Sequence, residues 1–368
     1  MAARKNEAKW IEARQRWQIN VMNEGERKTF TSSTPGKKGK IEAEKKADKW
    51  LKEGLIGETT KVGDLLDRWY GTLVKSTSEA HYRQQDSYIR NWIKPVIGNK
   101  KIGKLSVVDL QEVIDNAYHK GNLAEKTLKN IRATLMAFVK YCRAIPCTTL
   151  FPEGLRIPKG AKVSEKKIIV EEDVKKLFSS TLSTYRMNVV EDFWVYAYRF
   201  VVVNGIRPGE LIGLKWSDIN GNKLTINRSI NDRGYVTQGK NKNARRTILL
   251  PAIAQEILLA QKDMLKANAV SSAYVFPEKN GEHLSQENFR TNWKRYCAYN
   301  NIDNALTPYE MRHTFVSIMD EMPEGLKKMV VGHSKSMDTE GVYGHEKAGD
   351  RERAAAYVDA AFSRILRS

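Results

Sequence analysis

The stretch Leu306-Thr-Pro-Tyr-Glu-Met-Arg-His-Thr-Phe315 decides how this sequence is interpreted, because it predicts a helix with a guanidinium, Arg312, near its start. Two further groups follow it: the imidazole of His333 and the phenol of Tyr343, which lies in a segment bounded by glycines. An arginine fork binds phosphate oxygens, and a phenol can attack phosphorus once its proton is removed. The three groups together predict a site for phosphodiester chemistry.

A second arginine lies in Asn204-Gly-Ile-Arg-Pro-Gly-Glu-Leu-Ile-Gly-Leu214. Pro208 favours the first helical position, so Arg207 is expected at a helix N-terminus, where free N–H groups and the helix dipole favour an anion. Glu210 is placed to orient that guanidinium or to cap the helix. A surface arginine beside an ordinary helix start is the alternative interpretation.

Lys240 is expected at the tip between two strands, in Gln238-Gly-Lys-Asn-Lys242. Such a lysine can reach into a DNA groove or give a proton to a leaving oxygen, and Lys242 is a rival for the same role. Taken singly, Lys240 could be a solvated turn lysine, His333 a capping histidine and Tyr343 an ordinary aromatic. The order Arg, Lys, Arg, His, Tyr favours the chemical interpretation.

The chain carries a large positive charge. Of its 368 residues, 62 are lysine or arginine and 43 are aspartate or glutamate, which gives +19 at pH 7. This excess favours an anionic polymer as partner, since Lys and Arg make the contacts to phosphate. A basic protein with no nucleic-acid role is the alternative that charge alone leaves open.

The three cysteines, Cys142, Cys147 and Cys297, fit neither a disulfide framework nor a zinc site, because none is flanked by histidine at ligand spacing. No apolar run approaches the ~18 residues that a membrane span needs. The charged N-terminus lacks the apolar core of a signal peptide. We therefore expect a cytoplasmic protein with no metal, cofactor or membrane partner.

Residues 1–57 predict a small module of two strands, 16–22 and 27–32, then a basic loop, 35–40, and a helix. The expected buried face of the helix comprises Ile41, Ala47, Trp50 and Leu51. A small basic sheet can lie in a DNA groove, whereas a solvated charged appendage is the alternative. The side chains expected on DNA are Arg16, Arg27, Lys28, Lys37, Lys38 and Lys40.

Residues 58–150 predict an all-α domain of four helices, because apolar residues recur there at helical spacing. Pro95 is expected to end the second helix, and Ser106 with Asp109 resembles a capping box that opens the third. The apolar stripes comprise Val62, Leu65, Leu66, Trp69, Tyr70 and Leu73, then Leu110, Val113, Ile114 and Ala117, and lastly Leu128, Ile131, Leu135 and Phe138. Prolines and glycines then predict a linker over residues 151–167.

Residues 168–368 predict a mixed α+β unit. Its helices alternate with one three-stranded patch formed by 223–230, 234–240 and 245–250, after which Pro251 opens a helix. Arg245 and Arg246, with Lys242, are expected to contact DNA.

These motifs resemble those of the tyrosine recombinases, the integrase family of phages and conjugative transposons. The matching stretches are Gly205-Ile-Arg-Pro-Gly-Glu-Leu211, Lys240 before Arg245-Arg-Thr-Ile-Leu-Leu-Pro251, Met311-Arg-His-Thr-Phe315, Gly332-His333 and Tyr343-Gly-His345. The resemblance implies a multidomain, mainly α fold with small β-sheets. It also implies an order of parts: an arm-type DNA-binding module, a helical, SAM-like core-binding domain and a catalytic domain.

By this resemblance, Arg207 and Arg312 would clamp the scissile phosphate, and Lys240 would serve as general acid. His333 would hydrogen-bond the phosphate, and Tyr343 would be the nucleophile that forms a 3′-phosphotyrosyl link. The function implied is site-specific recombination of double-stranded DNA at core and arm-type sites, for integration or excision of a mobile element. The protein would then act at the bacterial nucleoid, with room for an accessory DNA-bending or excision factor.

One position departs from the family's pattern. The family usually has histidine three residues before its second arginine, and Tyr309 stands there in this chain. Tyrosine can hydrogen-bond a phosphate but is a poor proton shuttle at neutral pH, while His313 is expected to face elsewhere on the helix. A DNA-binding relative that has lost catalysis would explain Tyr309 and is kept as an alternative. A type IB topoisomerase-like enzyme, which would share cleavage and religation, is the other alternative.

A final helix over residues 351–366 carries an apolar stripe at helical spacing. Packing on its own domain is one interpretation. The resemblance favours docking on a neighbouring protomer, in a head-to-tail ring of four on two DNA duplexes.

Overall fold

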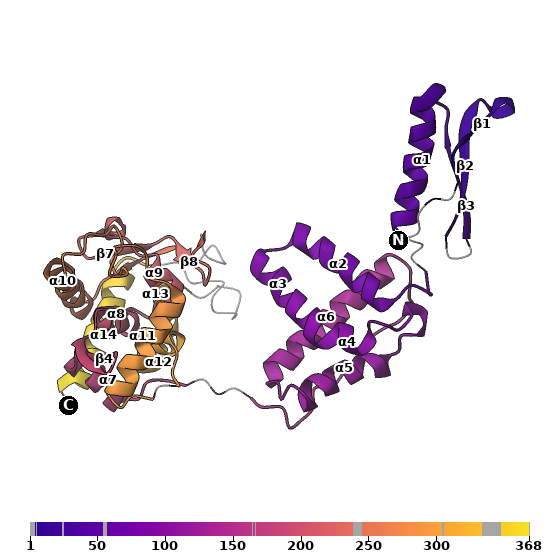
Figure 1. Cartoon of the computed structure of the whole chain (residues 1–368). Coiled ribbons are helices and arrows are strands. Elements are labelled where there is room, and N and C mark those ends of the chain that lie inside the picture. Colours follow the sequence, from indigo (N-terminus) through magenta and orange to yellow (C-terminus); the bar gives the residue numbers. More distant parts are fainter. Residues whose placement is uncertain are drawn as a thin grey trace. The chain divides into compact units, whose positions relative to one another are not determined.

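The chain divides into two compact units, residues 1–164 and 165–368, in this computed structural model (Figure 1). The structure describes residues 4, 6–23, 26–53, 57–163, 165, 167–237, 245–303, 305–332 and 347–367. Within those ranges, none of the helices could span a lipid bilayer. Each unit is built around its own hydrophobic cores.

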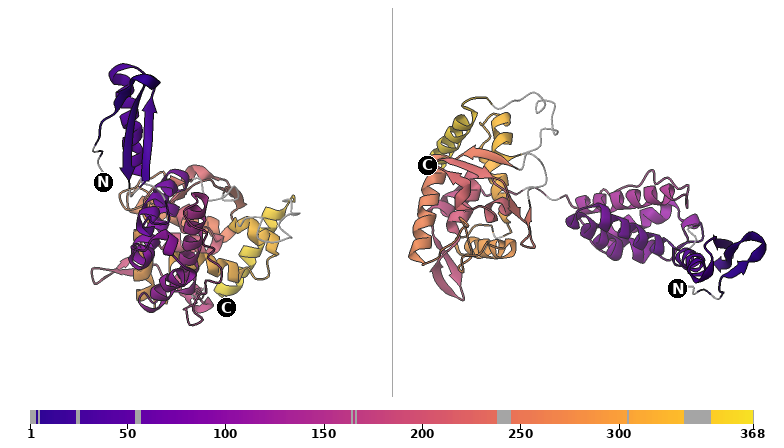
Figure 2. Two further views of the ribbon diagram at one scale, coloured as in Figure 1. Left: turned by 90° about the vertical axis from the view of Figure 1, so that its right-hand side faces the viewer. Right: turned by 90° about the horizontal axis from the view of Figure 1, so that it is seen from above.

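The N-terminal module is an antiparallel sheet, β1 (Lys9–Ile11), β2 (Arg16–Asn23) and β3 (Glu26–Ser32), covered on one face by helix α1 (Gly36–Glu53) (Figures 1 and 2). A short 3₁₀ helix, Glu12–Arg14, joins β1 to β2. The strands predicted over 16–22 and 27–32 are confirmed, and β1 is an addition. The small core comprises Ala8, Ile19, Val21, Ala43, Ala47, Trp50 and Leu51.

Two details of the helix prediction were wrong. The basic stretch expected as a loop forms the first turns of α1, because Gly36 adopts positive φ and starts the helix directly after Pro35. Ile41 is 50% exposed rather than buried, and Ala43 takes the inward position instead. Lys37, Lys38 and Lys40 are thereby carried on a helix.

The helical domain comprises α2 (Val62–Ser76), α3 (Glu79–Tyr88), α4 (Lys94–Ile97), α5 (Val107–His119) and α6 (Glu125–Ala144), with a 3₁₀ turn at Ile102–Lys104. The capping box is confirmed: Ser106 Oγ accepts the Asp109 N–H at 3.3 Å, and an Asp109 carboxylate oxygen accepts the Ser106 N–H at 2.9 Å. The predicted stripes of α5 and α6 are fully buried in one core with those of α2.

Pro95 does not end a helix, contrary to the prediction. A π-helical turn, Ile89–Ile93, follows α3 directly, and Pro95 then occupies the first turn of α4. A proline in the first turn of a helix loses no helical hydrogen bond, so the chain stays helical until Gly98.

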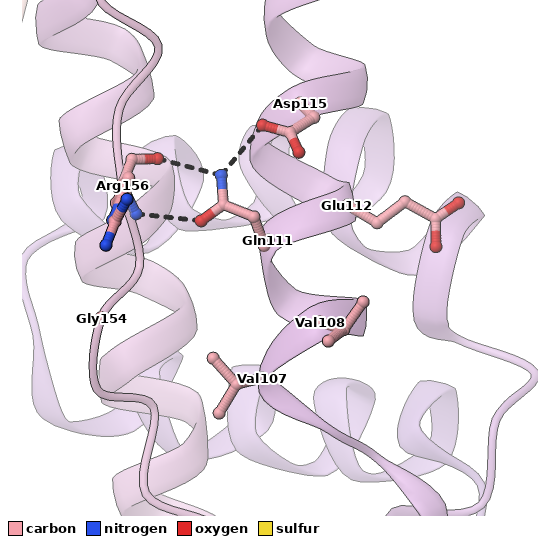
Figure 3. Close-up of a pocket in the computed structure, with 7 residues that line it drawn as sticks. All are labelled: Val107, Val108, Gln111, Glu112, Asp115, Gly154 and Arg156. Carbon is pink, nitrogen blue, oxygen red and sulfur yellow. Dashed lines mark hydrogen bonds between the residues drawn. The ribbon is translucent and has the colours of Figure 1, made fainter.

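The segment predicted as a linker packs on the helical domain for most of its length. The Arg156 N–H donates to the Gln111 side chain at 2.9 Å, and that amide donates to the Arg156 carbonyl at 3.0 Å (Figure 3). Leu155 and Ala161 are buried in the helical core, and the Glu125 N–H donates to the carbonyl of Lys162. Prolines and glycines prevented regular structure here without preventing packing.

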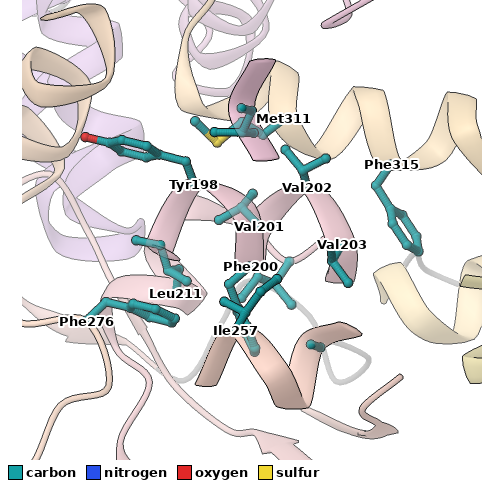
Figure 4. Close-up of a cluster of buried hydrophobic side chains, with 14 of the residues drawn as sticks. Tyr198, Phe200, Val201, Val202, Val203, Leu211, Ile257, Phe276, Met311 and Phe315 are labelled. Atoms are coloured by element: carbon teal, nitrogen blue, oxygen red, sulfur yellow. The ribbon is translucent and has the colours of Figure 1, made fainter. Parts of the chain in front are cut away.

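The second unit contains α7 (Glu171–Ser179), α8 (Val195–Asn204), α9 (Pro208–Ile212), α10 (Ala252–Ala267), α11 (Gln286–Tyr299), α12 (Pro308–Ile318), α13 (Glu324–Val331) and α14 (Asp350–Arg367). Helix α8 is buried on nearly all sides and forms the centre of the core. Figure 4 shows Phe200 of α8 on the side of Phe276 and Ile257, and Val202 on the side of Met311. The elements that carry Arg207 and Arg312 therefore pack against the buried centre of the unit.

The strands of this unit pair differently from the prediction. β7 (Lys223–Ile226) lies between β10 (Arg246–Leu249) and β6 (Ile219–Asn220), which follows a 3₁₀ turn, Trp216–Asp218. β8 (Ser229–Ile230) and β9 (Val236–Thr237) form a separate hairpin, as do β4 (Leu182–Tyr185) and β5 (Asn188–Glu191), which were not predicted. The chain leaves the sheet after β7 because Arg228 turns inward to donate to Asp218 at 3.0 Å and to the Gly213 carbonyl at 3.2 Å.

Helix α14 packs on its own unit in this single chain, and docking on a neighbouring protomer stays a prediction. Ala354, Val358, Phe362 and Ile365 are part of the unit's core, and the ring of Phe362 lies 5.8 Å from that of Phe178 on α7. The apolar stripe is thus already covered within the chain.

Candidate active site

Arg207 lies where the sequence places it, at the residue before helix α9. Its backbone N–H donates to Glu210 Oε2 at 3.0 Å, and its guanidinium Nη1 donates to Glu210 Oε1 at 2.7 Å. Its Nη2 donates to the carbonyl oxygen of Gly332, the residue that ends α13, at 3.1 Å. The predicted contact between Glu210 and this guanidinium is confirmed.

Arg312 projects from α12 into the interior, and 2% of it is exposed. Its Nη1 donates to the carbonyl of Gly205 at 2.7 Å, whereas its Nη2 is buried without a hydrogen-bond partner in the described part of the chain. Gly205 has a φ of +59°, and an added Cβ would lie 2.3 Å from the Phe315 ring. A buried guanidinium with an unused N–H is a donor prepared for an anion.

Arg246 was predicted to contact DNA, but its side chain is turned into the protein. Its side chain is only 7% exposed, and it forms an ion pair with Glu210 of 2.9 Å. Its Nε also donates to the Val330 carbonyl on α13 at 2.7 Å. The sequence carried a signal of this burial, because Arg246 lies two and four residues before the buried Ile248 and Leu250 and so shares their face of the strand.

The electrostatics of the cluster follow from this arrangement. Burial alone would raise the pKa of Glu210, but the hydrogen bond and charge of Arg246, and then Arg207, hold that pKa below its ordinary value. Burial, together with the positive charge of Arg207, lowers the pKa of Arg312 to about 10. Glu210 is therefore ionised and Arg312 protonated at neutral pH, and the cluster places one carboxylate among three guanidiniums.

Tyr309 lies on the exposed side of α12, with 46% of its surface accessible. Its ring packs edge-on against His313, with 5.2 Å between the ring centroids. His313 therefore faces Tyr309, one turn away, rather than elsewhere as predicted. The position where the family usually has histidine is thus occupied by a phenol that contacts an imidazole.

Several predicted site residues lie outside the described residues, namely Lys240, Lys242, His333 and Tyr343. The described chain comes within three residues of Lys240 at Thr237 and of Lys242 at Arg245, and it reaches Gly332, the residue before His333. Arg245, predicted to contact DNA, is exposed. The described part of the candidate site is thus the cluster of Arg207, Glu210, Arg246 and Arg312, called here the arginine cluster.

Of the residues of the N-terminal module that were predicted to contact DNA, some contact other side chains and others are exposed. Lys40 pairs with Glu7 at 2.7 Å, and the Lys28 ammonium lies 5.8 Å from the ring centroids of both Phe30 and Trp50. Arg16 is half-buried, while Arg27, Lys37 and Lys38 are exposed. The exposed residues remain available to a ligand.

An open groove of about 720 Å³ in the helical domain has the wrong charge for a phosphodiester. Val107, Val108, Gln111, Glu112 and Asp115 of α5 line one side and Gly154 and Arg156 the other (Figure 3). Its two carboxylates would repel phosphate. In the described ranges, no three His, Cys, Asp or Glu side chains are placed to hold a metal ion.

Comparison with known proteins identifies the family. Residues 168–349 match the phage integrase family, and residues 61–118 match the phage integrase N-terminal SAM-like domain.

The chain belongs to the phage integrase family.

It is an enzyme of the tyrosine-recombinase type, and the predicted fold class is confirmed. A XerC-like tyrosine recombinase of Caldanaerobacter subterraneus subsp. tengcongensis is 27% identical over 356 residues, covering 84% of this chain and 86% of that protein. An integrase of Streptomyces ambofaciens is 25% identical and covers 96% of both chains.

Solved structures of this integrase fold are similar over most of the chain. The Tn1549 transposon integrase in complex with transposon right end DNA superposes with a TM-score of 0.65 at 17% identity, covering 80% of this chain and 98% of that one. A lambda integrase tetramer bound to a Holliday junction gives a TM-score of 0.59 at 17% identity, covering 92% and 97%. At this level of identity the likeness establishes the fold.

Proposed function

We propose that this recombinase cuts and rejoins double-stranded DNA at specific sites through a phosphotyrosyl intermediate formed by Tyr343. The observation that carries the proposal is the buried Arg312, whose Nη2 has no hydrogen-bond partner among the described residues, beside the partly exposed Arg207. A buried unsatisfied donor is costly, and a bound phosphate oxygen would satisfy it.

The chemistry assigned to each residue follows from its type. Arg207 and Arg312 would hold the two non-bridging oxygens of the scissile phosphate and stabilise the charge that develops on them. The Tyr343 oxygen would form a bond to phosphorus while the bond to the 5′ oxygen breaks, and Lys240 would supply that oxygen with its proton. His333 would hydrogen-bond the phosphate. The new ester keeps the energy of the broken one, so the reverse attack by a 5′ hydroxyl rejoins the strand.

Tyr309 is assigned a contact with phosphate, or with water near it, through its hydroxyl. Its exposure leaves the hydroxyl accessible, and its contact with His313 brings an imidazole within one helical turn of it. A phenol and an imidazole together could carry the hydrogen bond and the proton that the usual histidine supplies alone.

The biological role proposed is integration and excision of a mobile element in the bacterial cytoplasm. Related proteins of the same fold are a transposon integrase and a phage integrase, the latter seen as a tetramer on a Holliday junction. On this basis, residues 1–57 would bind arm-type sites, residues 58–150 would bind the core site together with the catalytic domain, and four protomers would join two duplexes. An accessory DNA-bending or excision factor would fit the same scheme.

The test is to trap the covalent complex. A nicked duplex that carries an end of the element encoding the chain should accumulate a denaturant-resistant protein–DNA adduct, and Tyr343→Phe should bind this duplex normally without forming it. Adduct from the Phe variant would remove Tyr343 as nucleophile, and no adduct from the wild type would favour a relative that has lost catalysis. Exchange of strands between two duplexes, rather than relaxation of supercoils, separates a recombinase from a topoisomerase-like enzyme.

A further inference from the structure

The arginine cluster contains one member to which neither the family match nor the assigned chemistry gives a role. Arg246 begins strand β10. Among the described residues, its guanidinium makes three hydrogen bonds: to Glu210 Oε1 at 3.1 Å, to Glu210 Oε2 at 2.9 Å and to the Val330 carbonyl at 2.7 Å. It is nearly buried, so these donors are turned to the protein and not to a ligand. Arg207, by contrast, keeps 32% of its side chain exposed.

We propose that Arg246 is a positioning residue for recombination: it fixes Glu210, and through Glu210 the Arg207 guanidinium, against the last turn of α13. This inference rests on the proposed function, in which Arg207 contacts the scissile phosphate.

The contacts of Glu210 show how the effect is transmitted. Its carboxylate accepts two hydrogen bonds from Arg207 and two from Arg246, with both oxygens shared between the two arginines. A bidentate arginine fixes the plane of a carboxylate, so Arg246 determines the direction in which Glu210 accepts the Arg207 Nη1. Without Arg246, a buried carboxylate would keep a single cationic partner and could rotate toward it.

The last turn of α13 is the second point of attachment. Arg246 donates to the Val330 carbonyl and Arg207 donates to the Gly332 carbonyl, two residues further on. These are carbonyls that a helix C-terminus leaves unpaired, and cations there also interact favourably with the helix dipole. Arg246 thus joins three segments that are distant in sequence: the start of α9, the start of β10 and the end of α13.

The electrostatic balance gives Arg246 a second effect on the same residues. Arg207 and Arg246 both act to lower the pKa of Arg312, while Glu210 acts to raise it. The carboxylate offsets repulsion among the three guanidiniums, and Arg246 keeps it in the position where it does so. A change at Arg246 therefore reaches both arginines of the proposed phosphate clamp without touching DNA.

The experiment compares Arg246→Met and Arg246→Lys with a matched control, Arg228→Met. Arg228 is a partly buried arginine that is likewise paired with a carboxylate, Asp218, in the same unit, but its hydrogen bonds go to Asp218 and to the Gly213 carbonyl and not to a member of the cluster. Each variant is first checked for its melting temperature. Single-turnover formation of the covalent adduct on the nicked duplex is then measured at saturating protein, alongside the salt dependence of binding.

We expect Arg246→Met to slow adduct formation by about 100-fold, the scale typical of a misplacement of roughly 1 Å, with the dissociation constant nearly unchanged. Arg246→Lys should recover part of the rate, because one ammonium can reach only some of the three acceptors. The slope of binding affinity against salt should stay at its wild-type value, since no phosphate contact is lost. The effects of Arg246→Met and Glu210→Gln should be strongly non-additive, because both act through one contact.

Three results would overturn the inference. One is a salt slope lowered by about one unit with normal cleavage at saturation, which marks a direct phosphate contact. Another is equal slowing by Arg228→Met, which marks general loss of stability. The third is additivity with Glu210→Gln. If the wild type itself forms no adduct, the proposed function is rejected. If the wild type forms the adduct and Arg246→Met forms it at the same rate, only the inference about Arg246 is rejected.

Discussion

The helical domain and the catalytic unit treat their charged residues in opposite ways. Among the described residues, the ion pairs of the helical domain lie at its surface, and three of them join residues four apart: Glu79–Arg83, Asp86–Arg90 and Glu125–Lys129. The catalytic unit buries Glu210 and Arg312 and connects them to partners from distant segments. Exposed pairs contribute little free energy, whereas buried charges cost several kcal/mol unless they are paired.

This difference shows where function constrains the molecule. A helical domain that binds a ligand with its outer surface can keep an apolar core of ordinary composition. The proposed chemistry at a phosphate requires charge inside the catalytic unit, where three arginines surround one glutamate. Substitutions in the two units should therefore have different effects. In the helical domain they should lower the stability of the fold, and in the catalytic unit they should lower the rate of adduct formation.

The largest expected effect is on the fold of the helical domain. Phe138 is fully buried, with its ring 5.7 Å from that of Trp69, so Phe138→Ala should lower the free energy of unfolding by about 3–5 kcal/mol. Denaturant unfolding followed by tryptophan fluorescence measures this. Val108→Ala, at a position 76% exposed, is the control and should change little. Equal effects from both variants would contradict the assignment of this core.

The next effect is on rate. Arg312→Lys should slow adduct formation by about 10²–10³-fold, because one ammonium cannot both donate to the Gly205 carbonyl and reach the phosphate. Single-turnover assays at saturating protein measure the rate, and circular dichroism checks the fold. A variant that cleaves at the wild-type rate would show that Arg312 is structural only, and the contrast between the two units would then fail.

A third change separates buried charge that serves the site from buried charge that does not. Burial raises the pKa of Asp192 to about 6, although its carboxylate accepts the Trp194 N–H at 2.8 Å. A carboxyl whose pKa is higher in the folded state binds its proton more tightly there, so stability is lost as pH rises from about 4 to about 6.

Asp192→Asn keeps the acceptor oxygen and cannot ionise. It should therefore stabilise the protein at pH 7.5 by up to about 3 kcal/mol and hardly at all at pH 4. Thermal unfolding at both pH values measures the difference. An equal change in stability at the two pH values would mean that ionisation of Asp192 is not involved.

The smallest expected effect concerns Tyr309. Tyr309→Phe should slow cleavage by about tenfold if the hydroxyl contacts the phosphate in the transition state, and Tyr309→His should keep or raise the rate. A Phe variant with the wild-type rate would show the hydroxyl to be idle. His313→Gln is the companion variant, since it removes the imidazole packed against Tyr309 while keeping a hydrogen-bonding side chain.

What could be predicted from the sequence was local. The Ser106 capping box, the two strands of the N-terminal module and Arg207 before Pro208 each depend on neighbours within a few residues, and each was found. The burial of Arg246 depends on Glu210 and on Val330, residues 36 and 84 positions away, and no local pattern specifies those partners.

The other errors have the same origin. The prediction at Pro95 failed because the rule assumes a uniform α-helix and not a π-helical turn before it. The predicted strand pairing was wrong because Arg228 points inward and donates to Asp218, which lies ten residues earlier on a separate 3₁₀ turn. The apolar stripe of α14 was found correctly, but the pattern of one helix does not identify what covers it.

The contact between α14 and α10 has a consequence for the order in which the catalytic unit is made. Helix α10 begins after Pro251 without a side-chain cap of its own, and the Asp359 carboxylate accepts the N–H groups of Ala252 and Ile253 at 2.9 and 3.1 Å. Asp359 is translated 107 residues after Ala252, so α10 leaves the ribosome with two open donors that stay hydrated until α14 arrives. A nascent chain interrupted before Asp359 would lack the acceptor for these two N–H groups and would thus present an uncapped start of α10 to proteases.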